Sequence, residues 1–510
     1  MATYLGIDVG TSAIKAVLVD ERQTVLAESN VPLSVSRPRP LWSEQEPEAW
    51  WRAVEQAVAH LRGQADAAFA DIRGIGLSGQ MHGAVLLDET DRPLRPAILW
   101  NDGRSFREAE ELQAEHPDLS RTVGVLPMPG FTAPKLLWVA RHEPETFRAI
   151  RTVLLPKDYI RLKLTGQRTT DMSDAAGTWW LDEGRRSWSD RALATTGLDR
   201  RQMPHLVEGS EPSGLLRPEL VQNWGVSNNV IVAGGAGDAG AGAVGLGAID
   251  EGAAFLSLGT SAQLLVATNT FRPAPDTLVH AFCHAVPDRW FQMAAMLNGA
   301  SCLAWAAEFL REDISTLLRE TEDRFVQPAA CLFLPYLTGE RTPHNDPHAR
   351  GVLFGMSPQT DRVEFVQAVL EGVAFSLADA KECIEEAGTR LSGAGVIGGG
   401  SRSGLWTKIL ANALDLPLTR YKGGDKGPAF GAARLARLAA TGEPIEFVCT
   451  AQRVHDVVFP EPHLVEAYRP RIEAFRRLYR ALRPEFPRAL NVQAGSAAGA
   501  SERNAAVDAS

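Results

Sequence analysis

The stretch that decides the fold lies at the start of the chain and reads Tyr4-Leu5-Gly6-Ile7-Asp8-Val9-Gly10-Thr11-Ser12-Ala13-Ile14-Lys15-Ala16-Val17-Leu18-Val19. It contains two apolar, strand-like runs separated by a short polar turn. Strands joined by so few residues must be antiparallel, so the pattern predicts a hairpin. Further along the chain, strand and helix patterns alternate, which is typical of an α/β protein.

The same turn recurs in the second half of the chain. Gly259-Thr260-Ser261-Ala262 repeats Gly10-Thr11-Ser12-Ala13, and each copy lies between two apolar strand patterns. This repetition indicates a duplicated domain. Because the strand pattern restarts at Val230–Ala233, we expect a first domain over 1–228 and a second over 229–488. The small, polar residues 489–510 are expected to form a disordered tail.

Composition excludes several classes of protein. Of the 510 residues, 45% are hydrophobic and 22% charged, which is ordinary for a soluble globular chain and unlike a disordered, coiled-coil or collagen-like one. The net charge is −10, so we expect no nucleic-acid partner. We also expect no membrane partner, because no uncharged apolar run reaches the roughly 18–20 residues that span a bilayer.

Cysteine usage and the N-terminus indicate a cytoplasmic location. The five cysteines are far apart and odd in number, which predicts reduced thiols rather than a disulfide scaffold. The first residues run straight into a strand pattern, without the basic and apolar regions of a secretory signal.

The two Gly-Thr-Ser turns are candidate phosphate sites. Glycines Gly10 and Gly259 let backbone approach a ligand, and consecutive amides in a tight turn can bind an anion. Further donors come from the hydroxyls of Thr11, Ser12, Thr260 and Ser261. Each turn by itself also fits an ordinary hairpin. One turn in each half could hold a polyphosphate from opposite walls of a cleft.

Two charged residues lie close to the first turn. Asp8 ends an apolar strand and could hold Mg²⁺ through water, although it could equally bond the turn amides. Lys15 lies in the next strand and is a further phosphate candidate. Lysines at strand ends are usually solvated, so both interpretations of Lys15 stay open.

A glycine-rich segment around Asp238 is the next candidate site. Asp238 follows a strand and precedes a helix pattern, so it can serve as a helix N-cap, as a general base on a glycine-lined floor, or as both. Gly235, Gly237 and Gly240 match G-x-G-x-x-G, which raises a dinucleotide-binding alternative. The acidic residue expected about 20 positions further on is missing from this motif.

Two segments near strand ends suit the recognition of a polyol, whose hydroxyls need donors and acceptors. One is Gly79-Gln80-Met81-His82-Gly83 and the other is Leu99-Trp100-Asn101-Asp102-Gly103-Arg104. Trp100 could pack on a carbon skeleton. His82 could instead be a satisfied core histidine, but its flanking glycines favour a pocket.

A strand over Val396–Ile397 ends in three glycines and is followed by a helix pattern over Leu405–Leu414. A turn containing Gly399, Gly400 and Ser403 would let a flat ring or a ribose lie against backbone at a helix N-terminus. The alternative is a tight strand-to-helix turn, which needs only one glycine.

Longer motifs make the chain resemble the FGGY carbohydrate kinases. Gly130–His142 fits the first signature of that family, and Gly351–Met356 running to Ala368–Glu371 fits the second. Segments typical of one subfamily include Leu41–Gln45, Leu155–Tyr159 and the run Gly339-Glu340-Arg341-Thr342-Pro343-His344. The similarity extends roughly from Tyr4 to Leu482, and two long signatures in order are far more specific than one glycine motif.

The resemblance implies a fold and an activity. The fold is α/β, with two actin-like ATPase (ribonuclease H-like) domains and a central cleft, the first domain on the sugar side and the second on the nucleotide side. The implied reaction is phosphorylation of the 5-hydroxyl of D-xylulose by ATP and Mg²⁺. A homodimer is left open.

The resemblance also implies site roles. Asp238 is the catalytic base, and Asp8 assists the metal through water. Sugar contacts come from Gln80, Met81, His82, Trp100, Asn101, Asp102 and Asp238. Nucleotide contacts come from Gly10, Thr11, Ser12, Lys15, Gly259, Thr260, Ser261, Gly399, Gly400 and Ser403.

One departure from the family pattern leaves the acceptor open. The family usually follows the catalytic aspartate with a polar Asn or Gln that helps to hold the sugar, and this chain has Ala239 there. The alternatives are a kinase for another ketose or polyol, such as ribulose or a deoxy-ketose, and a non-catalytic actin-like ATP-binding module. A dehydrogenase is the third alternative.

Overall fold

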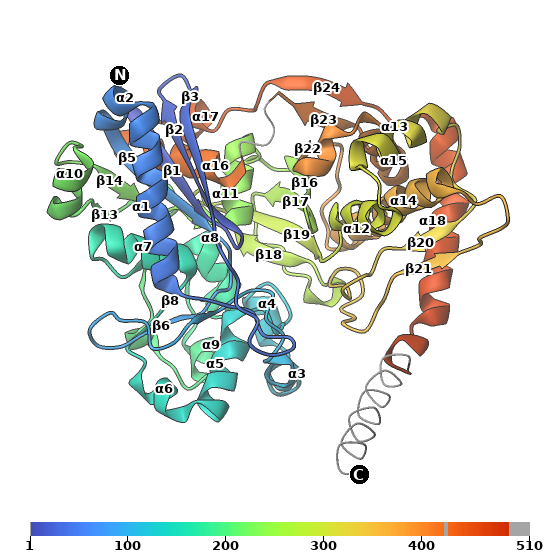
Figure 1. Cartoon of the computed structure of the whole chain (residues 1–510). Helices are drawn as coiled ribbons and strands as arrows, with labels where there is room; N and C mark the ends of the chain where they lie inside the picture. Colours follow the sequence, from blue (N-terminus) through green and yellow to red (C-terminus); the bar gives the residue numbers. More distant parts are fainter. Residues whose placement is uncertain (1, 423–426, 489–510) are drawn as a thin grey trace, which may run out of the picture.

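The opening hairpin forms as predicted. The computed structural model describes residues 2–422 and 427–488, and two mixed β-sheets flanked by helices make up its two halves (Figure 1). Strand β1 (Thr3–Val9) pairs antiparallel with β2 (Ala13–Asp20), with Asp8 opposite Lys15. The expected tail over 489–510 lies outside the described residues.

The first sheet grows outward from this hairpin. Its order is β13-β14-β5-β1-β2-β3, and β5 runs parallel to β1. Helix α1 (Pro47–Gln64) packs on β2 and β3 through buried residues such as Trp50 and Val54. Besides the hairpin, this sheet contains β3 (Val25–Pro32), β5 (Ile72–Gly79), β13 (Pro212–Leu215) and β14 (Ile231–Ala233).

The second sheet repeats the pairing of the first. Strand β16 (Ala254–Leu258) is antiparallel to β17 (Ala262–Thr268) and parallel to β22 (Ala394–Ile397), as β1 is to β2 and β5. The order is β18-β19-β17-β16-β22-β23-β24. The remaining strands are β18 (His280–Cys283), β19 (Trp290–Met296), β23 (Leu418–Tyr421) and β24 (Val454–Val458).

The strand at 231–233 does not start the second sheet. As β14 it pairs with β5 in the first sheet, and β15 (Ala236–Gly237) also pairs with β5. The chain therefore leaves the first sheet only where α11 (Asp238–Leu246) begins. The pattern of apolar residues locates a strand but not the sheet edge that accepts it. The boundary at 228/229 stays a prediction.

Smaller elements decorate the first half between its sheet strands. They are β4 (Glu44–Gln45), α2 (Asp66–Ala70), β6 (Val85–Leu87), β7 (Ala97–Ile98), α3 (Phe106–Glu115), α4 (Leu119–Thr122), α5 (Thr132–His142), α6 (Pro144–Ala149), β8 (Thr152–Leu154), α7 (Pro156–Thr165), β9 (Thr169–Asp171), α8 (Met172–Ala175), η1 (Ala176–Thr178), β10 (Leu181–Asp182), β11 (Ser187–Trp188), α9 (Asp190–Ala194), η2 (Arg200–Gln202), β12 (His205–Val207) and α10 (Pro218–Trp224).

The second half carries fewer and longer helices. Its further elements are η3 (Pro275–Thr277), α12 (Ser301–Leu310), α13 (Ile314–Arg324), β20 (Leu332–Leu334), β21 (Val352–Phe354), α14 (Arg362–Glu386), η4 (Gly399–Arg402), α15 (Gly404–Leu414), α16 (Gly427–Thr441), α17 (Ile445–Val448) and α18 (Pro462–Leu482). Within residues 2–422 and 427–488, no helix has the length and apolarity that crossing a membrane requires.

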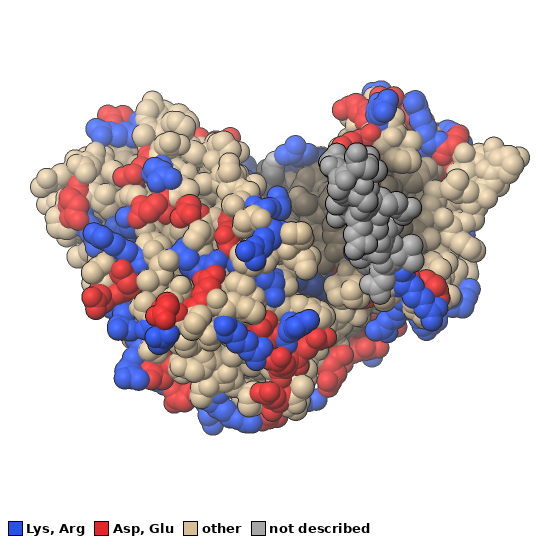
Figure 2. Space-filling view, turned by 60° about the horizontal axis from the view of Figure 1, so that its bottom comes forward, with Lys and Arg blue, Asp and Glu red and all other residues tan. Residues whose placement is uncertain are grey.

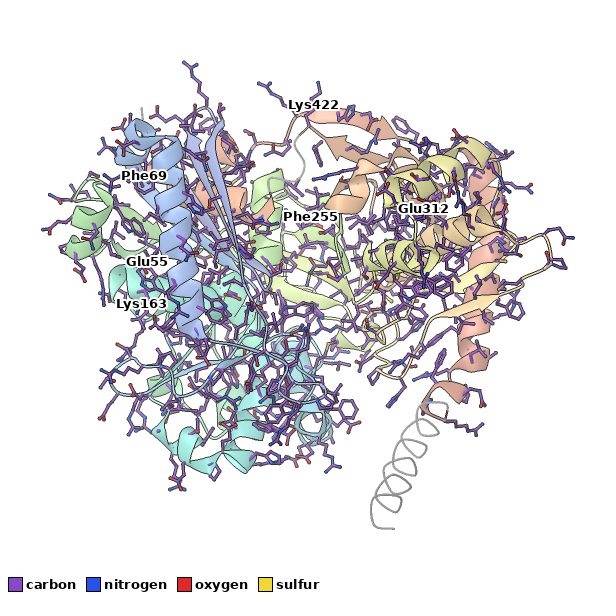
Figure 3. The ribbon with its side chains drawn as sticks, viewed as in Figure 1. Glu55, Phe69, Lys163, Phe255, Glu312 and Lys422 are labelled. Carbon is purple, nitrogen blue, oxygen red and sulfur yellow. The ribbon has the colours of Figure 1, made fainter. Side chains whose placement is uncertain are left out.

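Two helices join the halves. Helix α16 lies against β1 and β5 of the first sheet, although it comes from the end of the chain (Figure 1). Helix α11 packs on α16 where Gly245 meets Gly431, and its other side meets Phe255 of β16, which is labelled in Figure 3. Both helices can come this close because glycines line the contacts.

Glycine is required where α16 touches the sheet. A Cβ added at Gly6 or Gly76 would overlap the carbonyl oxygens of Ala429 and Ala432, and one at Gly74 would lie 2.6 Å from the carbonyl oxygen of Ala436. Backbone cannot retreat as a flexible side chain can. The contact therefore fixes the distance between α16 and the strands that carry Asp8.

We predict that Gly76→Ala lowers the midpoint of thermal unfolding strongly, by an amount equivalent to about 3 kcal/mol or more, because overpacking against backbone strains the core. Gly63→Ala is the matched control, since a Cβ at Gly63 meets nothing within 4 Å at the exposed end of α1. That control should be neutral or stabilising by about 0.5–1 kcal/mol. Equal midpoints for the two variants would contradict the close contact.

Candidate active site

A cavity of about 200 Å³ lies between the two halves, and Figure 2 shows that the surface is hollowed between the two lobes. Both halves contribute to its wall. The lining residues are Asp8, Gly10, Thr11, Gln80, Met81, His82, Trp100, Asp238, Ala239, Ser261, Gln263, His280, Met293, Ala295, Met296, Leu297, Arg341 and Pro428.

Two carboxylates share this cavity. Asp8 ends β1, and Asp238 begins α11. Burial, and after it the nearby charge of Asp8, raise the pKa of Asp238 to about 7. Burial also raises the pKa of Asp8, against a hydrogen bond from the Ser78 hydroxyl at 3.0 Å and the charge of Lys15. Like charges in a poorly solvated site disfavour ionisation of both groups.

The first turn of α11 fixes the position of Asp238. Gly237 is the N-cap residue, and Asp238 is the first helical residue, whose Oδ1 accepts the Ala239 amide at 2.8 Å. A Cβ at Gly237 would lie 2.7 Å from Cγ of Met81, so only glycine leaves room for that side chain. Asp238 therefore does not act as the N-cap, although its carboxylate does accept an amide of the first turn.

A network of buried polar groups holds the backbone at Gly237, next to Asp238. The Ser173 hydroxyl accepts the Gly237 amide at 3.3 Å and donates to Asp171 at 2.6 Å. Asp171 also pairs with Lys157 at 2.7 Å, and both side chains are fully buried. Buried charges persist when they are paired and hydrogen-bonded. This network restrains the backbone from which Asp238 projects.

The first Gly-Thr-Ser turn reaches the cavity through Gly10 and Thr11, whereas Ser12 is exposed. The Thr11 hydroxyl donates to Gln80 at 2.8 Å and accepts from the Trp100 indole at 2.9 Å. Gln80 in turn donates to Gln45 at 3.0 Å. A chain of hydrogen bonds thus ties the turn to the Gln80 and Trp100 side chains.

The second turn reaches the cavity through Ser261, and Thr260 is exposed. The segment before α12 holds this turn, because the Ala300 amide donates to the Gly259 carbonyl at 2.7 Å and the Gly299 amide donates to the Thr260 carbonyl at 3.1 Å. The structure therefore brings the two repeated turns to the same cavity from different halves, as the sequence predicts.

His82 is held in one orientation and one tautomer. Its backbone has φ +68, which is uncommon for a residue with a side chain, and its carbonyl accepts from Lys135 at 2.8 Å and from Thr132 at 3.1 Å. Ring atom Nδ1 lies 2.8 Å from the Gly177 carbonyl, so Nδ1 carries the proton. Burial keeps the pKa of His82 well below its ordinary value, which leaves Nε2 as an acceptor.

Asn101 and Asp102 do not line the cavity. Asn101 is exposed, and both Asp102 oxygens are occupied. Asp102 accepts the Ser43 amide at 2.6 Å and the side chain of Arg104 at 2.9 and 2.7 Å. Asn101, Asp102 and Arg104 are all polar in sequence, but the chain turns Asp102 toward Arg104, and none of the three lines the cavity. The sugar contacts of Asn101 and Asp102 stay predictions.

The other expected nucleotide residues have different surroundings. Lys15 is exposed opposite Asp8, and Gly399 is exposed with no atom within 4 Å of an added Cβ. Gly400 is packed against Leu258, where a Cβ would clash. The Ser403 hydroxyl accepts the Trp406 amide at 3.1 Å as the N-cap of α15. Gly399 therefore leaves open backbone beside a helix N-terminus, and Ser403 has a structural partner.

Two family models together match most of the chain. The model of the FGGY family of carbohydrate kinases, N-terminal domain, matches residues 3–245, and the C-terminal domain model of the same family matches residues 254–440. The chain belongs to the FGGY family of carbohydrate kinases. The whole first sheet of this kinase and every strand of the second except β24 therefore lie within matched domains.

Relatives match this kinase over most of their length. It is 48% identical to the xylulose kinase of Escherichia coli over 94% of its own chain and 99% of the relative, and 46% identical to that of Klebsiella pneumoniae over the same shares. A crystal structure of a "xyloylose kinase" from Brucella ovis superposes with a TM-score of 0.91 at 50% identity, covering 94% of this kinase and 99% of that chain. These similarities confirm the predicted two-domain α/β fold.

The kinase has cavity residues that the motifs did not identify. Gln263 of β17, His280 of β18 and Arg341 all come from the second half. Arg341 lies in the subfamily-like run at 339–344, and its charge next to Glu340 could have identified it as a candidate site residue. Gln263 and His280 lie inside apolar strand patterns and gave no signal of their own.

We predict that Asp238→Asn stabilises the kinase at alkaline pH. The folded pKa of Asp238, about 7, exceeds its ordinary value of 3.8, so its contribution to stability is fully present below about pH 4 and is lost as pH rises through about 7. The variant should therefore unfold about 2 °C or more above the parent at about pH 8, with the gain vanishing near about pH 4. Differential scanning calorimetry at both pH values measures it.

Asp250→Asn is the control for that measurement, because Asp250 is exposed near the end of α11 and outside the cavity. Its midpoint should shift equally at both pH values. A pH-independent shift for Asp238→Asn as well would contradict the raised pKa.

Proposed function

We propose that this kinase transfers the γ-phosphoryl group of ATP to the 5-hydroxyl of D-xylulose. The observation that carries the proposal is the shared cavity in which Asp238 meets Asp8, both repeated turns and the Met81-His82 pair. The acceptor is proposed from the extensive similarity to relatives named xylulose kinase. Because Ala239 replaces a polar residue, ribulose and polyols are the competing acceptors to test.

Asp238 is proposed as the general base. A base acts best when its pKa lies near the working pH, and burial together with Asp8 gives Asp238 a pKa of about 7. A carboxylate with an ordinary pKa would be too weak a base to remove much of the proton from an attacking hydroxyl. The hydrogen bond from the Ala239 amide to Asp238 and the one from the Gly237 amide to Ser173 restrain the carboxylate while the hydroxyl attacks.

Asp8 is proposed to assist Mg²⁺ through water. Its Oδ1 accepts from Ser78, and its Oδ2 lies toward the Gly10 turn, 3.8 Å from the position of a Cβ there. Within the described residues, no group of three or more His, Cys, Asp and Glu side chains is arranged to hold a metal. One carboxylate suits Mg²⁺, which completes its shell with water and phosphate oxygens and neutralises charge on the transferring group.

The remaining side chains are proposed to bind the substrates. His82 Nε2 can accept a hydrogen bond from a sugar hydroxyl. Trp100, held by its hydrogen bond to Thr11, offers an apolar face. The amides of both Gly-Thr-Ser turns are proposed to bind phosphate, and the open backbone at Gly399 to face the adenosine. Preorganised donors at the phosphate contribute most to phosphoryl transfer.

A cytoplasmic location is proposed from thiol chemistry. All five cysteines lie in the described part of the chain and are free, and four of them are buried. Unpaired buried thiols are typical of proteins kept in a reducing compartment.

The substrate assignment is tested by coupled ADP release with D-xylulose, D-ribulose, a 1-deoxy-ketose, xylitol and glycerol. We expect kcat/KM for D-xylulose to exceed that of every other acceptor by about tenfold or more, since one well-placed hydrogen bond discriminates by that factor. ADP release that does not depend on any sugar would instead indicate a non-catalytic ATP-binding module. Preference for D-ribulose would replace the proposed acceptor.

The role of Asp238 is tested by a pH profile. We expect kcat/KM to rise about tenfold per pH unit below about 7 and to level off above it, because the base must be ionised. Asp238→Asn should lower kcat by about 10²–10⁴-fold and flatten the profile. Asp250→Asn should keep the parental profile. Near-normal turnover of folded Asp238→Asn would remove Asp238 from the role of base.

A further inference from the structure

The glycine motif of residues 235–240 is packed against other parts of the protein. All three of its glycines are buried. A Cβ added at Gly237 would lie 2.7 Å from Cγ of Met81, and one at Gly240 would lie 3.1 Å from Oγ and 3.3 Å from Cβ of Ser173. The third glycine of the motif therefore lets the first turn of α11 lie directly against the Ser173 side chain.

Ser173 also holds the residue that precedes Asp238. Its hydroxyl oxygen accepts a hydrogen bond from the Gly237 amide at 3.3 Å, and the residue is only 1% exposed. Arg161 holds the other end of the same turn, because its guanidinium donates to the Gly234 carbonyl. Both ends of the turn that leads to Asp238 are therefore bonded to buried side chains, which restrain the backbone between them.

A buried network of charges fixes the orientation of the Ser173 hydroxyl. Asp171, the N-cap of α8, accepts the Ser173 amide at 2.9 Å and the hydroxyl at 2.6 Å. Lys157 Nζ lies 2.7 Å from Asp171 and 2.6 Å from Asp158, and all three side chains are fully buried. A hydroxyl has one proton, and this one is given to a carboxylate. Its lone pairs are therefore left for the Gly237 amide.

The segment that carries Ser173 also holds His82. Helix α8 continues directly into η1, where the Gly177 carbonyl lies 2.8 Å from Nδ1 of His82. A Cβ at Gly177 would lie 2.6 Å from that nitrogen, so the segment and the ring are closely packed. One short piece of chain thus contacts both the turn that carries Asp238 and the His82 ring, and a shift of Ser173 would move Asp238 relative to His82.

We propose that Ser173 is a positioning residue, which holds Asp238 where it can remove the proton of the acceptor hydroxyl. The inference rests on the proposed function, because it takes Asp238 to be the general base. Ser173 does not line the cavity, so it acts through the Gly237 amide rather than on a substrate. A base must lie within hydrogen-bond reach of the hydroxyl, and a small misplacement slows the reaction. Loss of the restraint should therefore lower kcat more than it weakens either substrate.

Two glycines of α11 give a matched pair of variants. Gly240→Ala places its Cβ against Ser173, whereas the Cβ of Gly242→Ala meets, beyond its own helix, only Cζ of Phe255 at 3.8 Å among the described residues. Both changes raise the helix propensity of α11 by the same amount. With D-xylulose we expect Gly240→Ala to lower kcat about 3–30-fold and to leave KM for ATP within about twofold. Gly242→Ala should keep the parental kcat.

Ser173→Ala removes the hydrogen bond itself, and Ser120→Ala is its control. Ser120 is also buried, and its hydroxyl donates to Gln113 at 2.9 Å, outside the cavity. Both changes should lower the midpoint of thermal unfolding, but only Ser173→Ala should lower kcat, by about tenfold. In an Asp238→Asn background, Ser173→Ala should lower kcat no further, because it acts through Asp238.

The inference is overturned if folded Ser173→Ala keeps the parental kcat, or if its effect is undiminished in the Asp238→Asn background. A loss confined to KM for ATP would also overturn it. Should Ser173→Ala not fold, the two glycine variants decide, and equal kcat values for Gly240→Ala and Gly242→Ala count against the inference. Failure of the parent to phosphorylate D-xylulose would instead overturn the proposed function.

Discussion

The structure depends on the close approach of α16 to β1 and β5. Gly6, Gly74 and Gly76 present bare backbone to a helix from the far end of the chain, and no larger residue fits between them. The same helix meets α11 at Gly245 and Gly431. Because Asp8 ends β1 and Asp238 begins α11, this one packed contact decides how far apart the two carboxylates are. Tight packing against backbone leaves little freedom to adjust that distance.

The electrostatics of the site follow from that distance. Burial and the charge of Asp8 together raise the pKa of Asp238 to about 7, and burial raises the pKa of Asp8 as well. The raised pKa that makes Asp238 a suitable base near neutral pH also has a thermodynamic consequence. Ionisation of this buried carboxylate at that pH lowers the stability of the folded state. Arg341 and the rings of His82 and His280, whose pKa values burial lowers, line the same cavity. One small cavity thus contains carboxylates, a guanidinium and neutral imidazoles.

Local patterns predicted much of this architecture. Two apolar runs and a short turn were enough to predict the β1–β2 hairpin, and the repeated Gly-Thr-Ser turn predicted a second copy of it, which β16 and β17 provide. Both turns and Asp238 reach the same cavity, as expected. Sequence patterns were less predictive wherever a side chain or a strand had alternative partners. Asp102 accepts hydrogen bonds from Arg104 and from the Ser43 amide, and β14 joins the first sheet by pairing with β5.

The sequence by itself determined the elements, the duplication and the family, since these depend on residues close together in the chain or on long ordered motifs. Only the tertiary structure decided which candidates share a cavity, because that depends on contacts between residues hundreds of positions apart, such as Gly76 with Ala432. It alone also brought Arg341 to the carbonyl of Trp100. A pKa or an unpaired donor is a property of surroundings, and those surroundings exist only once the chain has folded.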